Sequence, residues 1–348
     1  MRGFFSRGLK FIKGHKGVVT ASLVMAVVLM ASIISSVTSH ASCDCATCQI
    51  LKRYAMPGQT LTLLKTPIDL PYDYEGNYVY REPTFDDVYN VAEHAEATFK
   101  VITQNLRVNN AGDGEGNSLI ERLPRIEQVL KGYGADVYCF QECSTEWKPY
   151  ADDMMPSNEY ECVFMKTNVG HCNPIYIKRS ECAIIESGSF VISEINAEDY
   201  NENRVASWVI LKKNNSAKTM LVINAHLPVT NNTQNVACQK IMEFVKTKTV
   251  DGYVICGDFN FTKEGNVQAY NTMTAEGTKD LEFAAASEGT VGEIGPTFHD
   301  YGRRENPIKI DYFFGSDSVI STKYSVIKDM VDGKYLSDHY GIYQEATI

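Results

Sequence analysis

Short continuous apolar runs recur along residues 99–348 and are separated by stretches with helical spacing. Runs of this length, bounded by polar or glycine residues, predict strands that are buried on at least one face. The predicted strands cover residues 101–107, 136–142, 181–192, 204–211, 219–224, 253–256 and 310–314.

Two segments between the strands carry apolar residues three and four positions apart, which predicts amphipathic helices. The first spans residues 119–132 and should end at Gly132 and Gly134. The second spans residues 234–248, with an inward face made of Val236, Ile241, Phe244 and Val245. A third, shorter helix is expected at residues 86–99, directly before the first strand. The alternation of strands and helices indicates α and β structure in one domain, and two sheets packed face to face with helices outside would satisfy it.

Polar groups that suit hydrolytic chemistry occur at the ends of these apolar runs. They comprise carboxylates, carboxamides and imidazoles, which together can hold a metal ion and activate water. A single Gly-Asp-x-Asn string would carry little weight, because glycine and asparagine also mark ordinary turns. Here the groups recur at one strand after another: Asn105, Arg107, Gln141, Glu142, Asn224, His226, Asp258, Asn260, Asp311, Asp338 and His339.

In this order, the motifs make residues 99–348 resemble the endonuclease/exonuclease/phosphatase superfamily, which includes pancreatic deoxyribonuclease, deadenylases, sphingomyelinases and inositol-phosphate phosphatases. The stretches at residues 105–108, 174–176 and 297–299 look most like an uncharacterised bacterial group within it. The resemblance implies an α+β fold, a four-layer α/β/β/α sandwich that forms a single catalytic domain. It also implies metal-dependent hydrolysis of phosphate esters, and it does not choose the substrate.

A phosphate ester needs a cation that offsets the charge on its phosphoryl oxygens. Glu142 is the foremost predicted ligand for such a metal, because it closes a buried strand that gives no other reason for a charge. Asn105 would bind the metal or its water through the amide oxygen, and Asp338 would complete the shell. Oxygen ligands of this kind suit Mg²⁺, with Mn²⁺ or Ca²⁺ as alternatives.

The resemblance places the water-activating groups in the C-terminal half of the chain. Asp258 and Asn260 would orient or deprotonate the attacking water and hold a phosphate oxygen. Asp311 and His339 look like a carboxylate–imidazole pair, in which the carboxylate fixes the tautomer of the ring. His226 would be the second catalytic imidazole, as a proton donor or as a clamp on phosphate.

Three further residues are expected to contact the substrate phosphate. Arg204 begins an apolar strand and matches a phosphate-contacting arginine, although a solvated strand end would give the same pattern. Asn224 would orient His226 or the phosphate. His171 stands roughly where deoxyribonuclease-like relatives carry a glutamate that supports the first histidine, so we expect it to face the substrate instead. His299, in a predicted loop, would line the substrate side of the cleft or be solvated.

The N-terminal part of the chain has a different pattern. Residues 1–17 carry basic residues and no acid, and residues 18–37 are uncharged, mostly apolar, and long enough to span a bilayer. We interpret residues 1–41 as a signal peptide or a membrane anchor, and residues 42–98 as a spacer. The positive flank predicts export, so the protein would be extracytoplasmic, either membrane-anchored or secreted. A buried core helix is the alternative for the apolar segment.

Charge and cysteine content add two constraints. The net charge of −10 argues against tight, nonspecific binding of duplexes, although local basic contacts can offset it. Cys139 and Cys256 lie within apolar strands and are expected to be core thiols. One pair among Cys162, Cys172 and Cys182 could form a disulfide.

These observations favour a Mg²⁺-dependent phosphodiesterase, with nucleic acid as the first choice of substrate. The alternatives are a sphingomyelinase-like or small-molecule phosphohydrolase, and a catalytically inactive binding module on the same fold. The expected partners are a phosphodiester substrate (nucleic acid or a phospholipid head group) and, if the N-terminal segment is uncleaved, a membrane. No protein partner is indicated by the sequence.

Overall fold

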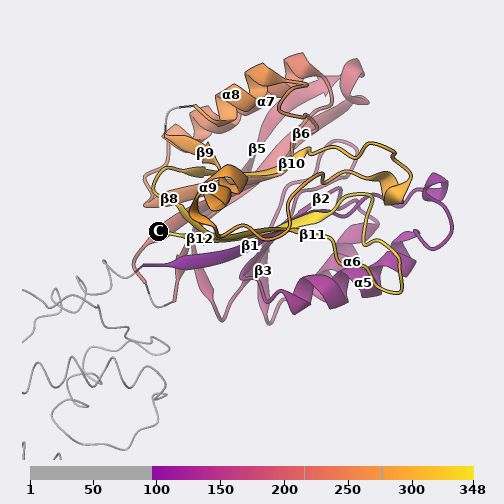
Figure 1. The fold of residues 1–348 in the computed structure, drawn as a ribbon, viewed down its shortest axis with the longest axis horizontal. Helices are drawn as coiled ribbons and strands as arrows, with labels where there is room; N and C mark the ends of the chain where they lie inside the picture. The colour runs from indigo at the N-terminus through magenta and orange to yellow at the C-terminus, as the bar shows by residue number, and fades with distance from the viewer. Residues whose placement is uncertain (1–95, 215, 276) are drawn as a thin grey trace, which may run out of the picture. The chain divides into compact units, whose positions relative to one another are not determined.

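Apolar runs from all parts of residues 98–348 pair into two sheets, which face each other across a central core (Figure 1). The computed structural model describes residues 96–214, 216–275 and 277–348. The predicted signal or anchor segment and nearly all of the predicted spacer lie outside the described residues. Among the helices that the structure describes, none is long and apolar enough to cross a bilayer.

The first sheet places the first strand of the domain in its interior. β1 pairs in parallel with β2 and antiparallel with β12, the last strand of the chain. The register aligns Asn105 with Gln141, so the polar ends of β1 and β2 reach the same edge. In spatial order, the strands are β11 (Ile320–Ile327), β12 (Gly341–Thr347), β1 (Thr98–Asn105), β2 (Val137–Gln141), β4 (Ile175–Lys178) and β3 (Tyr160–Val163).

The second sheet brings three of the predicted site residues into register. The parallel pairing of β7 with β8 aligns His226 with Asp258. The antiparallel pairing of β8 with β10 aligns Asp258 with Asp311. In spatial order, the strands are β5 (Cys182–Asn196), β6 (Glu202–Lys213), β7 (Thr219–His226), β8 (Gly252–Asp258), β10 (Asp311–Ser316) and β9 (Thr278–Asp280).

Helices cover the outer face of each sheet, which completes the predicted four-layer α/β/β/α sandwich. One core lies between the sheets and is built from inward residues such as Val101 and Val222. A second core packs α5 (Leu119–Gly132) and α6 (Trp147–Met154) on the first sheet, and a third packs α7 (Asn231–Lys246) and α8 (Val267–Met273) on the second. A short helix, α9 (Leu281–Glu288), packs beside β10 and β11.

Comparison with the predicted helices gives one match and two corrections. α5 covers the predicted residues, whereas α7 begins at Asn231 and ends at Lys246. Val236 is 48% exposed rather than inward, because Ala237, Cys238, Ile241, Met242 and Val245 form the buried stripe of α7. Thr98 and Phe99 belong to β1 and not to a helix, and the remainder of that predicted helix, apart from residues 96 and 97, lies outside the described residues.

The cysteines of the described residues are all free thiols. Cys139 and Cys256 are buried in the core between the sheets, as predicted. No disulfide joins Cys162, Cys172 or Cys182, so that expectation was wrong. Cys162 lies on β3 of the first sheet, whereas Cys182 begins β5 of the second, and the Cys172 thiol donates to the Cys143 carbonyl at 2.9 Å.

Candidate active site

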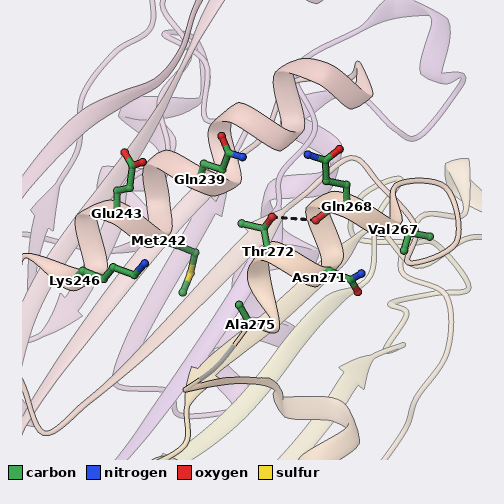
Figure 2. A pocket seen from close by; sticks show the side chains of 9 residues that line it. All are labelled: Gln239, Met242, Glu243, Lys246, Val267, Gln268, Asn271, Thr272 and Ala275. Atoms are coloured by element: carbon green, nitrogen blue, oxygen red, sulfur yellow. Dashed lines mark hydrogen bonds between the residues drawn. The ribbon is translucent and has the colours of Figure 1, made fainter.

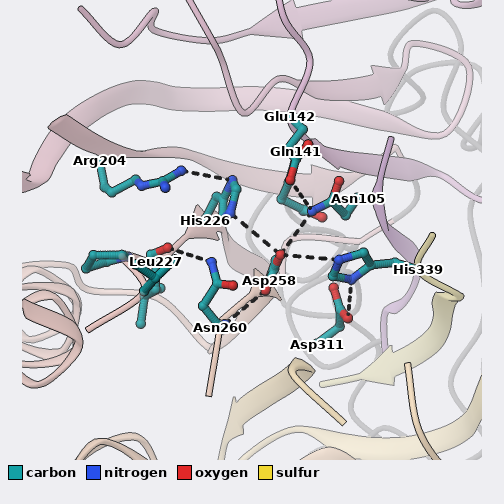
Figure 3. Close-up of polar contacts among 12 residues, drawn as sticks. Asn105, Gln141, Glu142, Arg204, His226, Leu227, Asp258, Asn260, Asp311 and His339 are labelled. Atoms are coloured by element: carbon teal, nitrogen blue, oxygen red, sulfur yellow. Dashed lines mark hydrogen bonds and ion pairs between the residues drawn. The ribbon is translucent and has the colours of Figure 1, made fainter. Parts of the chain in front are cut away.

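The carboxyl ends of β1 and β2 in one sheet meet those of β7 and β8 in the other. The Asn105 Nδ2 atom donates to Asp258 Oδ2 across the two sheets at 2.9 Å. Deeper between the sheets, Gln141 Nε2 donates to Asn224 Oδ1 at 2.7 Å. The polar strand ends that the sequence singled out are therefore gathered at one place (Figure 3).

Asp258 lies at the centre of this cluster, at the end of β8 (Figure 3). Its Oδ2 atom is 3.6 Å from His226 Nε2 and 3.8 Å from His339 Nε2. Its Oδ1 atom accepts the backbone N–H of Asn260 at 2.9 Å, which fixes the rotation of the carboxylate. A carboxylate in this position can accept a proton from a water molecule that lies beside His226 or beside His339.

Burial and charge shift the pKa values of Asp258 and His339, two acid–base groups of this cluster. Burial raises the pKa of Asp258, the negative charge of Asp311 raises it further, and the resulting pKa is about 7. Burial alone would lower the pKa of His339, but the carboxylates of Asp311 and Asp258 outweigh it and raise that pKa well above its usual value. Asp258 is therefore suited to exchange protons at neutral pH.

Asp311 and His339 form the carboxylate–imidazole pair that the sequence indicated. Their Oδ2 and Nδ1 atoms are 2.9 Å apart. The backbone N–H of Asp311 donates to Thr297 Oγ1 at 3.1 Å, which anchors the acid at the start of β10. Because Nδ1 is held by a carboxylate, which only accepts, Nε2 is the ring atom turned toward Asp258.

Glu142 directly follows β2 with a φ of 52°, a left-handed conformation that few non-glycine residues adopt. Asn105 Nδ2 donates to its Oε1 atom at 3.1 Å, and the Val108 backbone N–H donates to its Oε2 atom at 2.9 Å. Strained backbone held by such bonds is common where a side chain must be aimed at a ligand. Glu142 is thus presented toward the cluster rather than to open solvent.

Two overlapping groups of side chains could hold a metal ion. Within each group, the potential ligand atoms all lie within 4.8 Å of one another. One group contains Glu142, His226 and Asp258, and the other contains Asp258, Asp311 and His339. Carboxylate oxygens predominate and no thiolate takes part, a donor set that fits a hard divalent cation.

The other two predicted ligands, Asn105 and Asp338, also have hydrogen-bond or ion-pair partners within the protein. Asn105 Oδ1 accepts the backbone N–H of Arg107 at 2.8 Å, and its amide nitrogen faces Glu142 and Asp258. Asp338 belongs to neither metal-holding group. It is buried, with Oδ2 3.5 Å from Arg107 Nε, and burial raises its pKa.

His226 faces an arginine where a carboxylate partner would be usual. Its Nδ1 atom lies 3.3 Å from Arg204 Nη1, and Asp199 holds that guanidinium through Nε and Nη2 at 3.0 and 3.2 Å. A guanidinium only donates, so Nδ1 accepts and Nε2 carries the hydrogen that faces Asp258. Burial and the charge of Arg204 lower the pKa of His226. The sequence indicated that no glutamate supports this histidine, and in the structure the Arg204 guanidinium lies beside Nδ1 instead.

The structure gives Asn224 and Asn260 different surroundings. Asn224 is fully buried, and its Nδ2 donates to the carbonyls of Phe140 and Pro174 at 2.8 and 3.0 Å. With its Oδ1 bound to Gln141, the amide joins the two sheets, and it has no spare donor for a phosphate. Asn260 has a φ of 54° and donates from Nδ2 to the carbonyl of Leu227 at 2.9 Å, beside Asp258.

His299 does not line a substrate surface and is not solvated. It is 2% exposed and packs against Tyr335 and Tyr340 with tilted rings, whose centroids are 4.4 and 4.0 Å away. Its Nδ1 atom accepts the Gly302 backbone N–H at 3.2 Å. Burial and the charge of His339 lower its pKa to about 4, so it is a neutral packing residue.

Two buried acids of the site were missed by the sequence reasoning. Asp199 holds Arg204, and Glu202 Oε1 lies 3.0 Å from His171 Nδ1. One signal was available, because Glu202 and Arg204 are two positions apart on a strand and so share a face. Asp199 lies in a 3-10 turn before β6, where no periodicity marks it.

The groove between α7 and α8 lies elsewhere on the second sheet's outer layer (Figure 2). Its lining includes Gln239, Met242, Glu243, Lys246 and Val267. None of the strand-end groups contributes to it, and it holds no cluster of imidazoles or carboxylates. The chemistry of the described residues is therefore concentrated at the strand ends.

With this geometry established, comparisons with known proteins identify the fold. A crystal structure of an endonuclease/exonuclease/phosphatase from Bacteroides vulgatus superposes with a TM-score of 0.64 at 23% identity, over 72% of this chain and 98% of the other. A mannosyl-6-phosphatase from Bacteroides thetaiotaomicron gives a TM-score of 0.60 at 21% identity, over 71% and 99%. TDP2 from D. rerio, solved with a single-strand DNA product, gives 0.57 at 16% identity, over 72% and 99%.

The chain therefore has the endonuclease/exonuclease/phosphatase fold, as the sequence motifs indicated. No family model matches the sequence, and no curated protein matches it. At these identities the likeness establishes the architecture alone, because one fold carries many activities.

Proposed function

We propose that this protein is a metal-dependent phosphoric ester hydrolase that acts on phosphodiesters, with nucleic acid as the preferred class of substrate. The observation that carries the proposal is Asp258, buried between two imidazoles and adjoining Glu142 through Asn105. A binding module would gain nothing from a buried acid whose pKa is raised to about 7.

Glu142, beside Asp258, would hold the cation, for which Mg²⁺ is the first expectation and Mn²⁺ or Ca²⁺ the alternatives. When bound, the ion supplies positive charge that offsets the charge on the phosphoryl oxygens. Asp258 accepts the proton of the attacking water, and the Asp311–His339 pair stabilises the charge on that carboxylate. Arg204 and the Nε2–H of His226 contact the phosphoryl oxygens.

The preference for a diester over a lipid head group is the finer part of the proposal. TDP2 from D. rerio, which shares the fold, was solved with a single-strand DNA product. The extracytoplasmic location inferred from the N-terminal segment is a further proposal and would suit a sphingomyelinase-like enzyme equally. A parallel assay of plasmid DNA, RNA and sphingomyelin separates these substrate classes.

The test of the chemistry is hydrolysis of bis(4-nitrophenyl) phosphate by the full chain in Mg²⁺ and in excess EDTA. We expect activity only with the metal, and a loss of about 100-fold or more in Glu142→Gln. Glu293→Gln is the matched control, because Glu293 is exposed and, within the described residues, its side chain pairs only with Lys328, so the activity of this variant should equal that of the parent. Full activity of folded protein in EDTA would contradict the metal-dependent mechanism.

A further inference from the structure

His171 and Glu202 form a second imidazole–carboxylate pair beside the active site. His171 Nδ1 lies 3.0 Å from Glu202 Oε1, and the Thr167 hydroxyl donates to the same oxygen at 2.8 Å. The side chain of Glu202 is only 5% exposed, whereas that of His171 is 31% exposed. The acid is therefore fixed inside the protein, and the ring it holds reaches the protein surface.

The pair is connected to the catalytic cluster from two sides. Glu202 Oε2 lies 3.5 Å from Arg204 Nη1, which in turn contacts His226. On the other side, the neighbour of His171, Cys172, exchanges backbone hydrogen bonds with Cys143 at 3.1 and 3.2 Å. Cys143 directly follows Glu142. His171 is thus held between the metal-holding strand end and the Arg204–His226 contact.

The hydrogen bond to Glu202 determines which ring atom is available. A carboxylate only accepts, so Nδ1 of His171 carries hydrogen and Nε2 is the atom left for a ligand. Burial works to raise the pKa of Glu202, but the hydrogen bonds from His171 and Thr167 and the charge of Arg204 outweigh it, and that pKa is lowered. Glu202 therefore stays ionised and accepts the Nδ1 hydrogen of His171.

His226 has the opposite surroundings. Its Nδ1 faces the Arg204 guanidinium, and its Nε2–H is directed at Asp258, 3.6 Å away. If the His226 ring were protonated, its positive charge would lie beside that of Arg204, and no carboxylate would hold its Nδ1 atom. Of His171 and His226, it is His171 whose Nδ1 atom is held by a carboxylate.

Resting on the proposed function, we propose that His171 is the group that gives a proton to the leaving oxygen of the ester, and that Glu202 is its positioning residue. The attacking water forms a bond to phosphorus and loses a proton to Asp258. The bond from phosphorus to the leaving oxygen breaks, and that oxygen takes the Nε2 proton of His171. Solvent then restores the proton to His171 and removes one from Asp258, so the net reaction consumes one water.

Two substrates that differ in the basicity of the leaving oxygen test this role. Thymidine 5′-(4-nitrophenyl phosphate) releases a nitrophenolate, which needs no proton, whereas the dinucleotide of two thymidines releases an alkoxide, which does. We expect His171→Ala to lower kcat on the dinucleotide about 100-fold or more and on the nitrophenyl ester by less than about 5-fold. Glu202→Gln should show the same selectivity to a smaller extent.

Glu142→Gln is the control, because loss of the metal site should reduce both reactions alike, and thermal unfolding checks that each variant is folded. Equal losses on both substrates in His171→Ala, or no loss on the dinucleotide, would overturn the assignment of His171 while leaving the proposed function in place. A parent protein that cleaves neither substrate would instead contradict the proposed function, and this inference with it.

Discussion

The protonation of Asp258 is the residue-scale feature with the widest consequences. The side chain is almost fully buried, and Asp311 is its cross-strand neighbour. Because its pKa in the folded protein, about 7, exceeds that in the unfolded chain, the unfolded chain loses the proton first. Stability is therefore lost as pH rises from about 4 to about 7. The acid that serves the chemistry weakens the metal-free fold at neutral pH.

We expect Asp258→Asn to abolish activity and, in EDTA at pH 8, to raise the free energy of unfolding. The pKa shift limits this gain to at most about 4 kcal/mol. The gain is smaller still because the amide keeps only one of the two carboxylate oxygens that accept from Asn105 and Asn260. It should shrink as the pH is lowered to 4.5, where the parent carboxyl is protonated in the fold. Urea titrations at the two pH values measure this, and a gain that is independent of pH would show that Asp258 is not strained by its charge.

His339→Ala and His299→Ala should damage the protein in different ways. His339 adjoins Asp258 and is held by Asp311, so we expect its loss to lower kcat by about 10²–10⁴-fold with the fold intact. His299 is packed between two tyrosines, so its loss should cost about 2 kcal/mol of stability and leave kcat within a few-fold. Turnover at saturation and thermal unfolding separate the two, and a His299→Ala protein that is stable but inactive would reverse the assignment.

At the scale of elements, Asn224 connects the two sheets at the base of the site. Its amide satisfies Gln141, the Phe140 carbonyl and the Pro174 carbonyl, all at positions buried from water. Asn224→Leu would leave these groups without partners, so we expect a loss of about 2–4 kcal/mol in the free energy of unfolding. If the variant unfolds like the parent but fails to bind substrate, the side chain acts on phosphate after all.

The strand β8 approaches β7 too closely for any side chain at Gly257. Its φ is 138°, and a Cβ there would lie 1.8 Å from the Ala225 carbonyl oxygen. Gly257→Ala should therefore separate the strands that carry His226 and Asp258, and we expect little soluble protein. Gly132→Ala, in α5 with open space around it, is the control and should be neutral or slightly stabilising. Soluble Gly257→Ala protein with parental activity would contradict the prediction that this position tolerates no side chain.

At the scale of the whole molecule, the domain begins at the strand in the interior of the first sheet. Ala97 exchanges backbone hydrogen bonds with Ile348, which joins the two ends of the domain at 2.9 and 3.0 Å. A chain that starts at residue 95 should therefore unfold cooperatively and keep the activity of the full chain. A chain that starts at residue 106 lacks β1 and Asn105 and should not fold. Thermal unfolding followed by circular dichroism and the bis(4-nitrophenyl) phosphate assay test both expectations. Loss of cooperative unfolding in the chain that starts at residue 95 would show that the preceding residues are needed.

The sequence by itself determined the elements and most of the reacting groups. Apolar runs with polar ends predicted β1, β2, β7 and β8, and helical spacing predicted α5 to the residue. These features are local, since the periodicity of a few residues records which face is buried. The pairing of Asp311 with His339 could be expected because both lie in motifs that resemble those of the superfamily.

Only the tertiary structure decided which polar groups face the cleft and which are used inside the protein. Asn224 and His299 lie in motifs like those of the catalytic residues, yet one joins the sheets and the other packs between tyrosines. Asp199 lies in a 3-10 turn without a distinguishing pattern and Glu202 begins β6, and pairing with Arg204 and His171 gives them a role. The physical reason is that a polar group's function depends on partners from distant strands, and the registers of those strands are fixed by packing of both sheets, which no local pattern records.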